Sequence, residues 1–279
     1  MVLGVAAAAL CLPAAASAHT GAFAKFNECP STTTGVAHCL YSVTNSGEII
    51  LGKKTTPIVN PVTLQGGYSK ENSEDTSSFY AASNNETLSK TKEPVPGGLL
   101  GIVPPESAPF LVKLLSKFFF ENELTGINAV LELAKPASEI QISNFRVLEE
   151  QGVALKLPVK VHLENPFLGS SCYVGSSSSP LIWNLTTGTT EPPEPNKPIT
   201  GSSGFVELQE GLEIVELKEN ILVENAWSAP EATGCGGVIS FLVDPIIDSE
   251  IGLPAKAGTN TAKLNNTIFS ATVGSVNKH

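Results

Sequence analysis

Apolar and polar residues alternate along much of this chain with the two-residue period of β-strands. In the longest such stretch, residues 153–163, every odd-numbered position is Val or Leu. The even-numbered positions include Lys156, Lys160 and His162, so the pattern predicts a strand with one buried face and one wet face. Pro158 lies inside the stretch and cannot donate a ladder hydrogen bond. We therefore expect an edge strand or a bulge at this position.

Shorter runs of the same kind predict a β-rich fold. The runs 206–209 and 212–218 flank Glu210-Gly211, which predicts a hairpin with a tight turn. Roughly a dozen strands separated by turn residues are typical of a large antiparallel β-sandwich or barrel-like domain, and this mainly β class is our prediction. The other predicted strands are 36–44, 48–53, 58–64, 127–133, 139–143, 181–186, 221–225, 238–243 and 261–273.

One α-helix is predicted at about 108–124. Glu106 and Ser107 can cap its start, and Gly126 follows its end. Its apolar residues cover most of its surface, so we expect it to pack against the β structure with its apolar side chains buried. A helix that binds a membrane surface or a partner is the alternative. The apolar residues are Phe110, Leu111, Leu114, Leu115, Phe118 and Phe119.

The first eighteen residues predict export from the cytosol. An apolar run at 2–12 is followed by Pro13 and by Ala16-Ser17-Ala18, whose small side chains suit cleavage before His19. We therefore predict a signal peptide at 1–18 and a secreted or cell-envelope protein, with an uncleaved anchor as the alternative. No other stretch is apolar for the roughly 20 residues that a membrane-spanning helix needs.

Four cysteines follow the predicted signal peptide. An even number in an exported chain indicates two disulfides. We favour Cys29–Cys39, which closes a short loop, and Cys172–Cys235, which joins two Gly/Ser-rich loops. The second bridge would span the proline-rich segment 191–198, which we expect to be an extended connector, so we predict one domain over 19–279.

The charge of the chain argues against some partners. Its net charge is −10, and its 17 basic residues are scattered with only one arginine, Arg146. Without a basic patch we predict no nucleic-acid binding. The polar segment 69–85 is expected to be an exposed loop.

No motif in the chain predicts a catalytic, cofactor-binding or metal-ligating residue. The histidines, His19, His38, His162 and His279, show no metal-binding or catalytic spacing, and the cysteines form no zinc motif. Clustered acids leave two alternatives open. Glu213, Glu216, Glu219 and Glu224 are candidates for the paired carboxylates of a glycosidase. Asp244, Asp248 and Glu250 are candidates for a calcium site, although the Gly and Asp/Asn spacing of a calcium loop is missing.

Several longer stretches resemble a family of uncharacterised secreted actinobacterial proteins. They are FNECP, HCLYSVTNSGE, NPFLGSSCYVGS, WNLTTGTTEPPEPNKPITG, NAWSAP and GCGG followed by VDPI, and they span most of the chain in this order. The resemblance implies an exported bacterial protein. It supplies no ligand, cofactor or catalytic residue, because that family has no assigned function.

These observations together favour a non-enzymatic binding or structural protein of the extracellular space or cell envelope, with no cofactor. One alternative is a carbohydrate-active enzyme, which requires two carboxylates about 5–10 Å apart in a cleft. The other is an oligomeric β-barrel pore, which requires an apolar outer band.

Overall fold

The computed structural model describes residues 18–98, 106–114, 125–209 and 211–279, and it is mainly antiparallel β, as predicted. The predicted signal peptide lies outside these residues, except for its last residue, Ala18. No helix among the described residues has the length and apolar character needed to cross a membrane. The strands are β1 His38–Leu51, β2 Lys54–Ile58, β3 Val62–Tyr68, β4 Ser77–Ala81, β5 Lys92–Val95, β6 Ile127–Leu133, β7 Gln141–Ile142, β8 Leu155–Glu164, β9 Tyr173–Val174, β10 Leu181–Leu185, β11 Phe205–Gln209, β12 Ile214–Glu224, β13 Ala232–Thr233 and β14 Thr261–Thr272.

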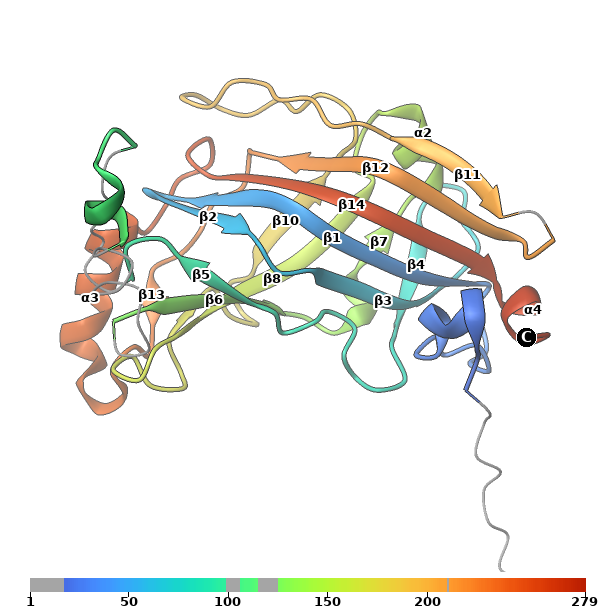
Figure 1. Cartoon of the computed structure of the whole chain (residues 1–279), viewed down its shortest axis with the longest axis horizontal. Coiled ribbons are helices and arrows are strands. Elements are labelled where there is room, and N and C mark those ends of the chain that lie inside the picture. Colours follow the sequence, from blue (N-terminus) through green and yellow to red (C-terminus); the bar gives the residue numbers. More distant parts are fainter. Residues whose placement is uncertain (1–17, 99–105, 115–124, 210) are drawn as a thin grey trace, which may run out of the picture.

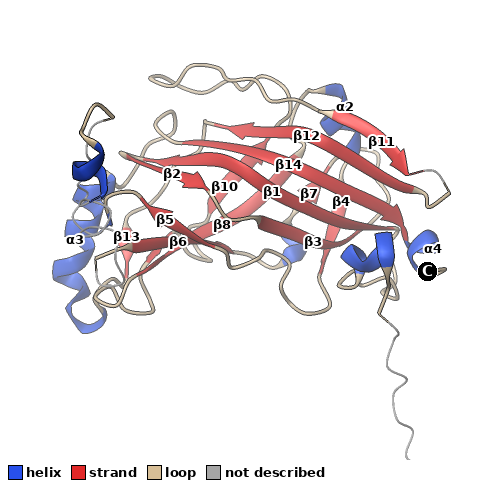
Figure 2. Ribbon diagram, viewed as in Figure 1, coloured by secondary structure: helices blue, strands red, loops and turns tan. Residues whose placement is uncertain are grey.

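The strands form two layers that face each other across the main core (Figures 1 and 2). One layer has the order β11-β12-β14-β1-β3, with β2 also paired to β1. The other is built around β8, which pairs with β6, β7, β9 and β10, while β5 pairs with β6. Strand β4 pairs with β3 of the first layer and with β7 of the second, so it joins the two layers along one side.

Strand β8 has the predicted alternation, but the prediction of an edge or a bulge at Pro158 is wrong. Strand β8 is central, and its pairing with β10 runs past Pro158 without a register shift. The Pro158 carbonyl accepts a hydrogen bond from the Ala134 N–H on the β6 side. Because the N–H and C=O groups of a residue in an antiparallel strand point to the same side, the missing N–H also faces that side. On that side of β8, strand β6 ends opposite Val159 and strand β7 begins opposite Lys156. Pro158 therefore faces the gap between β6 and β7, and the sheet loses no backbone hydrogen bond.

The predicted hairpin is present as β11 and β12, but its turn is longer than two residues, because Gln209 pairs with Ile214. Strand β12 extends to Glu224 and includes the separately predicted strand 221–225. The runs 36–44 and 48–53 likewise merge into the single strand β1. Register shifts interrupt both long strands, and these irregularities explain why each resembles two shorter strands in the sequence.

Three segments differ from their prediction. The predicted strand 58–64 instead covers the end of β2, the connection at 59–61 and the start of β3. Residues 238–243 were expected to form a strand, but they lead into and begin helix α3, Ser240–Ile251. The polar segment 69–85 contains β4, in which Ser77 and Phe79 are buried, so it is not simply an exposed loop. The remaining helices are η1 Gly21–Phe26, η3 Ala137–Glu139, α2 Asn144–Glu149, η4 Gly237–Ile239 and α4 Val273–Val276.

The helix predicted at about 108–124 is described only in its first turn. Residues 110–114 are helical, and residues 115–124, with Leu115, Phe118 and Phe119, lie outside the described part. The expected burial of Phe110 and Leu114 is wrong, because both side chains are exposed. In Figure 1 this turn is drawn at the same end of the molecule as α3.

Both predicted disulfides, Cys29–Cys39 and Cys172–Cys235, are present. The first is the centre of a small apolar cluster with Phe23 and Phe26. The second belongs to the main core. The segment 191–198 has no regular secondary structure, in agreement with an extended connector, and strands before and after it pair within the same layers.

Candidate functional site

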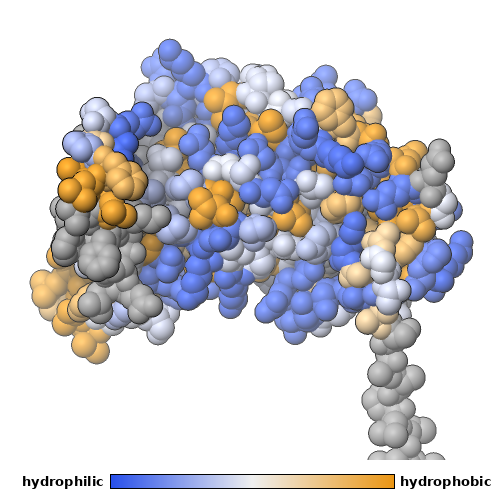
Figure 3. All heavy atoms as spheres, in the orientation of Figure 1, coloured by the Kyte–Doolittle hydropathy of each residue, from blue (hydrophilic) through white to orange (hydrophobic). Residues whose placement is uncertain are grey.

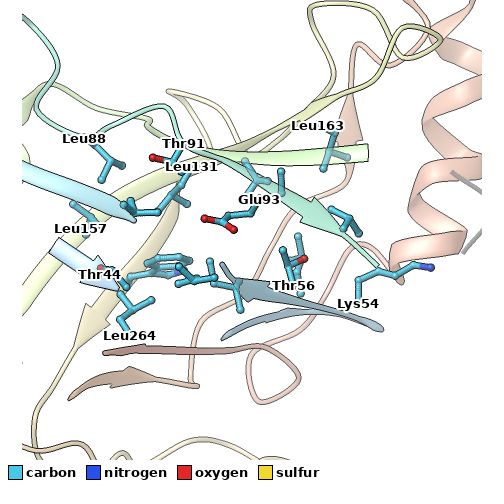
Figure 4. Close-up of a pocket in the computed structure, with 18 of the residues that line it drawn as sticks. Thr44, Lys54, Thr56, Leu88, Thr91, Glu93, Leu131, Leu157, Leu163 and Leu264 are labelled. Atoms are coloured by element: carbon cyan, nitrogen blue, oxygen red, sulfur yellow. The ribbon is translucent and has the colours of Figure 1, made fainter. Parts of the chain in front are cut away.

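The space between the two layers is not completely filled. A cavity of about 110 Å³ lies between them at the α3 end of the molecule, and we call it the α3-side cavity. Strands β1, β2, β3 and β14 line it from one layer, and β5, β6, β8 and β10 line it from the other. Figure 4 shows these side chains directed toward one another across the gap.

The walls of this cavity are mostly apolar side chains that do not pack fully against each other. Ile49, Val62 and Ala129 belong to the inward faces of their strands, yet they are only half-buried, as are Leu131 and Leu155. Protein interiors are normally packed as densely as organic crystals, and an apolar void loses dispersion contacts along its lining. Apolar walls that stay unpacked are typical of a space that receives a ligand.

Glu93 of β5 brings a carboxylate into this apolar space. Its residue is only 5% exposed, and its carboxylate accepts the Val59 N–H at 2.8 Å and the Asn60 N–H at 3.2 Å. Figure 4 shows the carboxylate between the two layers, near Thr91. A carboxylate offers about four lone-pair positions, so two backbone donors leave acceptor capacity for one more donor.

Trp183 of β10 also lines this cavity. Its side chain is fully buried and lines the cavity, with its ring centroid 5.7 Å from that of Trp227. The Trp183 indole N–H has no hydrogen-bond partner among the described residues. The indole N–H of Trp227, which does not line the cavity, likewise has no partner among the described residues, so this unpaired donor is not specific to the cavity.

A buried polar chain crosses the middle of the first layer. The Thr44 hydroxyl donates to the Asn266 side-chain oxygen at 2.7 Å, and the Asn266 amide donates to Asn220 at 3.4 Å. The Asn220 amide in turn donates to the carbonyls of Ser202 and Ser203 at 3.2 Å. These groups satisfy each other across β1, β14 and β12, so this polar stripe is part of the scaffold.

Helix α3 closes the outer end of the α3-side cavity. Ile247 and Ile251 are buried against the core and line the cavity. Lys54 of β2 and Glu250 of α3 also line it, and their charged groups are 3.4 Å apart. Because 48% of the Glu250 side chain is exposed, we expect this pair to contribute little stability.

A second cavity of about 300 Å³ lies between the layers toward β11, and we call it the β11-side cavity. It shares four lining residues with the first cavity, so the two spaces are adjacent. Its polar lining includes Tyr68, whose hydroxyl lies 2.6 Å from the Ser270 hydroxyl and whose pKa is raised by burial. His38 stacks on Tyr68, and burial and the charge of Lys70 lower the pKa of His38. The shared residues are Ser42, Leu64, Leu155 and Leu222.

The acids considered for calcium binding have other roles. Asp244 accepts the N–H groups of Gly234 and Cys235, and Asp248 accepts the N–H of Ala232 at 2.7 Å. Glu250 pairs with Lys54 of β2, as described above. The described residues contain no group of three His, Cys, Asp or Glu side chains that could hold a metal ion. The acids of α3 thus attach the helix to the core.

The four glutamates considered as paired carboxylates are not assembled into a pocket by any contact that we observe. Glu213 lies in the turn between β11 and β12, and Glu219 lies in the irregular part of β12, both with positive φ. Glu216 accepts a hydrogen bond from Gln209. Glu224 is buried, and its carboxylate accepts the N–H groups of Asn184 and Ala226.

Two other acids do meet a histidine on the outer face of the second layer. His162 Nδ1 lies 3.7 Å from Glu132 and 3.8 Å from Glu164, and the His162 ring stacks on Tyr173. Lys160 pairs with Glu132 at 3.2 Å, and Lys92 pairs with Glu164 at 2.6 Å. Glu132 is paired to a lysine on the adjacent strand β8, and Glu164 of β8 is paired to Lys92 of β5, which lies on the other side of β6. We therefore assign this cluster to stabilisation across the strands.

The comparisons with known proteins do not assign the chain to a family. No family model, no curated protein and no solved structure matches it. The resemblance to secreted actinobacterial proteins therefore stays a prediction.

The sequence did not indicate the cavity residues. Glu93 follows a polar loop, and the short strand β5 that carries it was not predicted. Trp183 lies in the correctly predicted strand β10, where a buried tryptophan is also typical of an ordinary core. One available signal was a glutamate two positions before Val95 in a segment of alternating residues, but four residues are too few for a periodicity argument.

Proposed function

We propose that this chain is an exported binding protein that holds an apolar ligand between its two β-layers. The observation that carries the proposal is the α3-side cavity, whose apolar walls remain half-buried inside the sandwich. A mostly apolar pocket with a few polar groups is the usual form of a small-molecule site. The two disulfides are compatible with an extracellular or cell-envelope location.

The polar groups in the cavity suggest the ligand class. Glu93 supplies an acceptor that holds two backbone N–H groups and can take one more donor. A hydroxyl group can donate that hydrogen bond, while the apolar walls suit the rest of the molecule. We therefore propose a neutral, mainly apolar molecule that carries a hydroxyl. A charged ligand is disfavoured, because the carboxylate repels anions and the apolar walls leave a cation poorly solvated.

The test uses the two tryptophans, Trp183 and Trp227, as an internal reporter, since both are buried and adjacent. The secreted protein is purified, its start at His19 is checked by intact mass, and an organic extract is analysed by mass spectrometry for apolar hydroxyl compounds. A neutral dye, N-phenylnaphthylamine, is then titrated while energy transfer from tryptophan is recorded. We expect saturable transfer, and displacement of the dye by the extracted compound.

The matched variants are Ala129→Phe, which fills the cavity, and Ala81→Phe, which makes the same change at an exposed position of β4. The added ring occupies the space that the dye needs, so Ala129→Phe should weaken dye binding by about tenfold or more, which corresponds to about 1.4 kcal/mol. Ala81→Phe should leave binding unchanged. Equal binding by all three proteins, or no saturable binding by the wild type, would contradict a ligand site between the layers.

A further inference from the structure

The inner face of the first layer is polar around the β11-side cavity. Figure 3 shows mostly hydrophilic side chains on the outside of this layer, so its inward side chains are expected to be apolar. Instead, His38 and Ser42 of β1, Tyr68 of β3 and Ser270 of β14 all line the cavity. The opposite part of the lining is apolar and includes Ile142, Val147, Ala154 and Leu155.

The hydroxyls of Tyr68 and Ser270 leave one hydrogen-bond donor for a ligand. Their oxygens are 2.6 Å apart, so one of the two hydroxyl protons forms the bond between them. The Asn144 amide donates to the Tyr68 oxygen at 3.4 Å, which uses a lone pair of that oxygen and neither proton. Among the described residues, no acceptor lies within hydrogen-bond distance of the second proton. Because buried polar groups normally have partners, this pair favours an acceptor in the cavity.

The ligand that fits this cavity is electrically neutral. Lys, Arg, Asp and Glu are absent from the described residues that line it. Burial, together with the charge of Lys70, lowers the pKa of His38, so His38 is uncharged at neutral pH. A charged group placed here would lose its hydration without gaining a partner of opposite charge, which is costly.

The β11-side cavity opens between α2 and β11. Its lining residues are buried or half-buried except for Leu148 of α2, which is 51% exposed, and Val206 of β11, which is 53% exposed. The Ser203 N–H, just before β11, donates to the Glu150 carboxylate, just after α2, at 2.7 Å, so the two elements are close at this point. Both exposed lining side chains are apolar, which suits the entry of an apolar molecule.

We propose that the β11-side cavity is a second ligand site, which takes a neutral apolar molecule with a carbonyl group. The Tyr68–Ser270 pair donates a hydrogen bond to the carbonyl oxygen, and the apolar lining contacts the rest of the molecule. This chemistry is the reverse of that at the α3-side cavity, where Glu93 accepts a hydrogen bond from the ligand. The two sites therefore select different molecules, and neither proposal depends on the other.

The test uses prodan, a neutral fluorescent ketone whose emission moves to longer wavelength when its carbonyl accepts a hydrogen bond. Either hydroxyl alone can still donate, so the variant that removes the donor is Tyr68→Phe/Ser270→Ala. We expect this variant to bind prodan about fivefold more weakly and to move the emission of the bound dye to shorter wavelength. The matched control, Tyr41→Phe/Ser178→Ala, removes the same two groups at positions that line neither cavity, and should bind like the wild type.

Further variants show which cavity holds the ketone. Ala129→Phe fills the α3-side cavity and should leave prodan binding unchanged, whereas Val206→Phe narrows the opening beside β11 and should weaken it. Val206→Phe also decides the outcome if thermal unfolding shows that Tyr68→Phe/Ser270→Ala does not fold.

Three results would overturn the second site. They are no saturable binding of prodan by the wild type, unchanged affinity and emission in the folded double variant or unchanged affinity in Val206→Phe, and loss of binding in Ala129→Phe, which would place the ketone in the α3-side cavity. Binding of prodan with these expected effects, but without binding of N-phenylnaphthylamine, would support this site and contradict the proposed function.

Discussion

At the scale of single residues, burial and hydrogen bonding decide what each acid does. The acids of this chain were candidates for catalysis or metal binding by their spacing alone, but spacing does not tell where a carboxylate points. Asp244 and Asp248 accept backbone hydrogen bonds, whereas Glu93 lies in an apolar cavity. Their roles depend on contacts between residues distant in the sequence, so the sequence pattern could not separate them.

Glu224 allows a direct test of such a buried carboxylate. Burial raises its pKa above the ordinary value of 4.5, although the N–H groups of Ala226 and Asn184 partly oppose the shift. A carboxyl with a raised pKa binds its proton more tightly in the folded state. Its contribution to stability is therefore greatest below pH 4.5 and is lost as the pH rises through the raised folded value.

Glu224→Gln should remove this dependence. Unfolding by urea between about pH 4 and pH 8 gives the free energy of unfolding of both proteins. We expect the wild type to lose stability relative to Glu224→Gln as the pH rises above 4.5, and the difference to become constant at higher pH. Asp248, whose pKa is also raised by burial, is present in both proteins and cancels. A difference that is independent of pH, or that changes in the opposite direction, would contradict the role assigned to Glu224.

At the scale of elements, the alternation of apolar and polar residues predicted most of the long strands. It failed where one sequence pattern suits both a strand and a helix. Residues 238–243 form a continuous run rich in β-branched and apolar residues, which suits a buried strand and a buried helix equally. Contacts with residues 232–235, made through the acids of α3, hold the helix in place. In β4 the apolar signal is a single Phe79 in a polar segment, so tertiary pairing with β3 and β7 defines that strand.

A substitution at Pro158 can test why the central strand β8 tolerates a proline. Because its backbone nitrogen faces the gap between β6 and β7, Pro158→Ala should change the free energy of unfolding by no more than about 1 kcal/mol. Val159→Pro is the control, since the N–H of Val159 faces β10, where the residue pairs with Leu181. Loss of that bond and the local clash should cost about 3 kcal/mol or more. Urea unfolding that ranks the two variants equally would show that the gap does not accommodate the proline.

At the scale of the whole molecule, the two ends of the sandwich are stabilised by different disulfides. Cys29–Cys39 holds the small cluster around Phe23 and Phe26, next to the ends of β1 and β14. Cys172–Cys235 lies in the main core, and the Cys235 N–H donates to Asp244 of α3. The second bridge therefore supports the end that closes the α3-side cavity.

The pairing of the cysteines was predictable, since an even number of cysteines and two distant Gly/Ser-rich loops favoured it. The cavity beside it was not, because a void depends on how two layers meet and leaves no pattern in either strand.

The disulfides should consequently differ in their contribution to stability. Cys172 and Cys235 are 63 positions apart, and Cys29 and Cys39 are 10 apart. Loop-closure entropy in the unfolded chain then gives about 4.3 kcal/mol for Cys172–Cys235 and about 2.8 kcal/mol for Cys29–Cys39, a difference of about 1.5 kcal/mol. Double Cys→Ala variants of each pair, compared by urea unfolding without reductant, measure it. We expect the Cys172/Cys235 variant to be less stable and also to bind the apolar dye more weakly, because segment 232–235, to which the acids of α3 are hydrogen-bonded, loses its covalent link to Cys172. The Cys29/Cys39 variant should keep dye binding while it remains folded. The reverse order of stability would show that local packing around Phe23 and Phe26 outweighs chain entropy, and weaker dye binding in both variants would contradict the separation of the two ends.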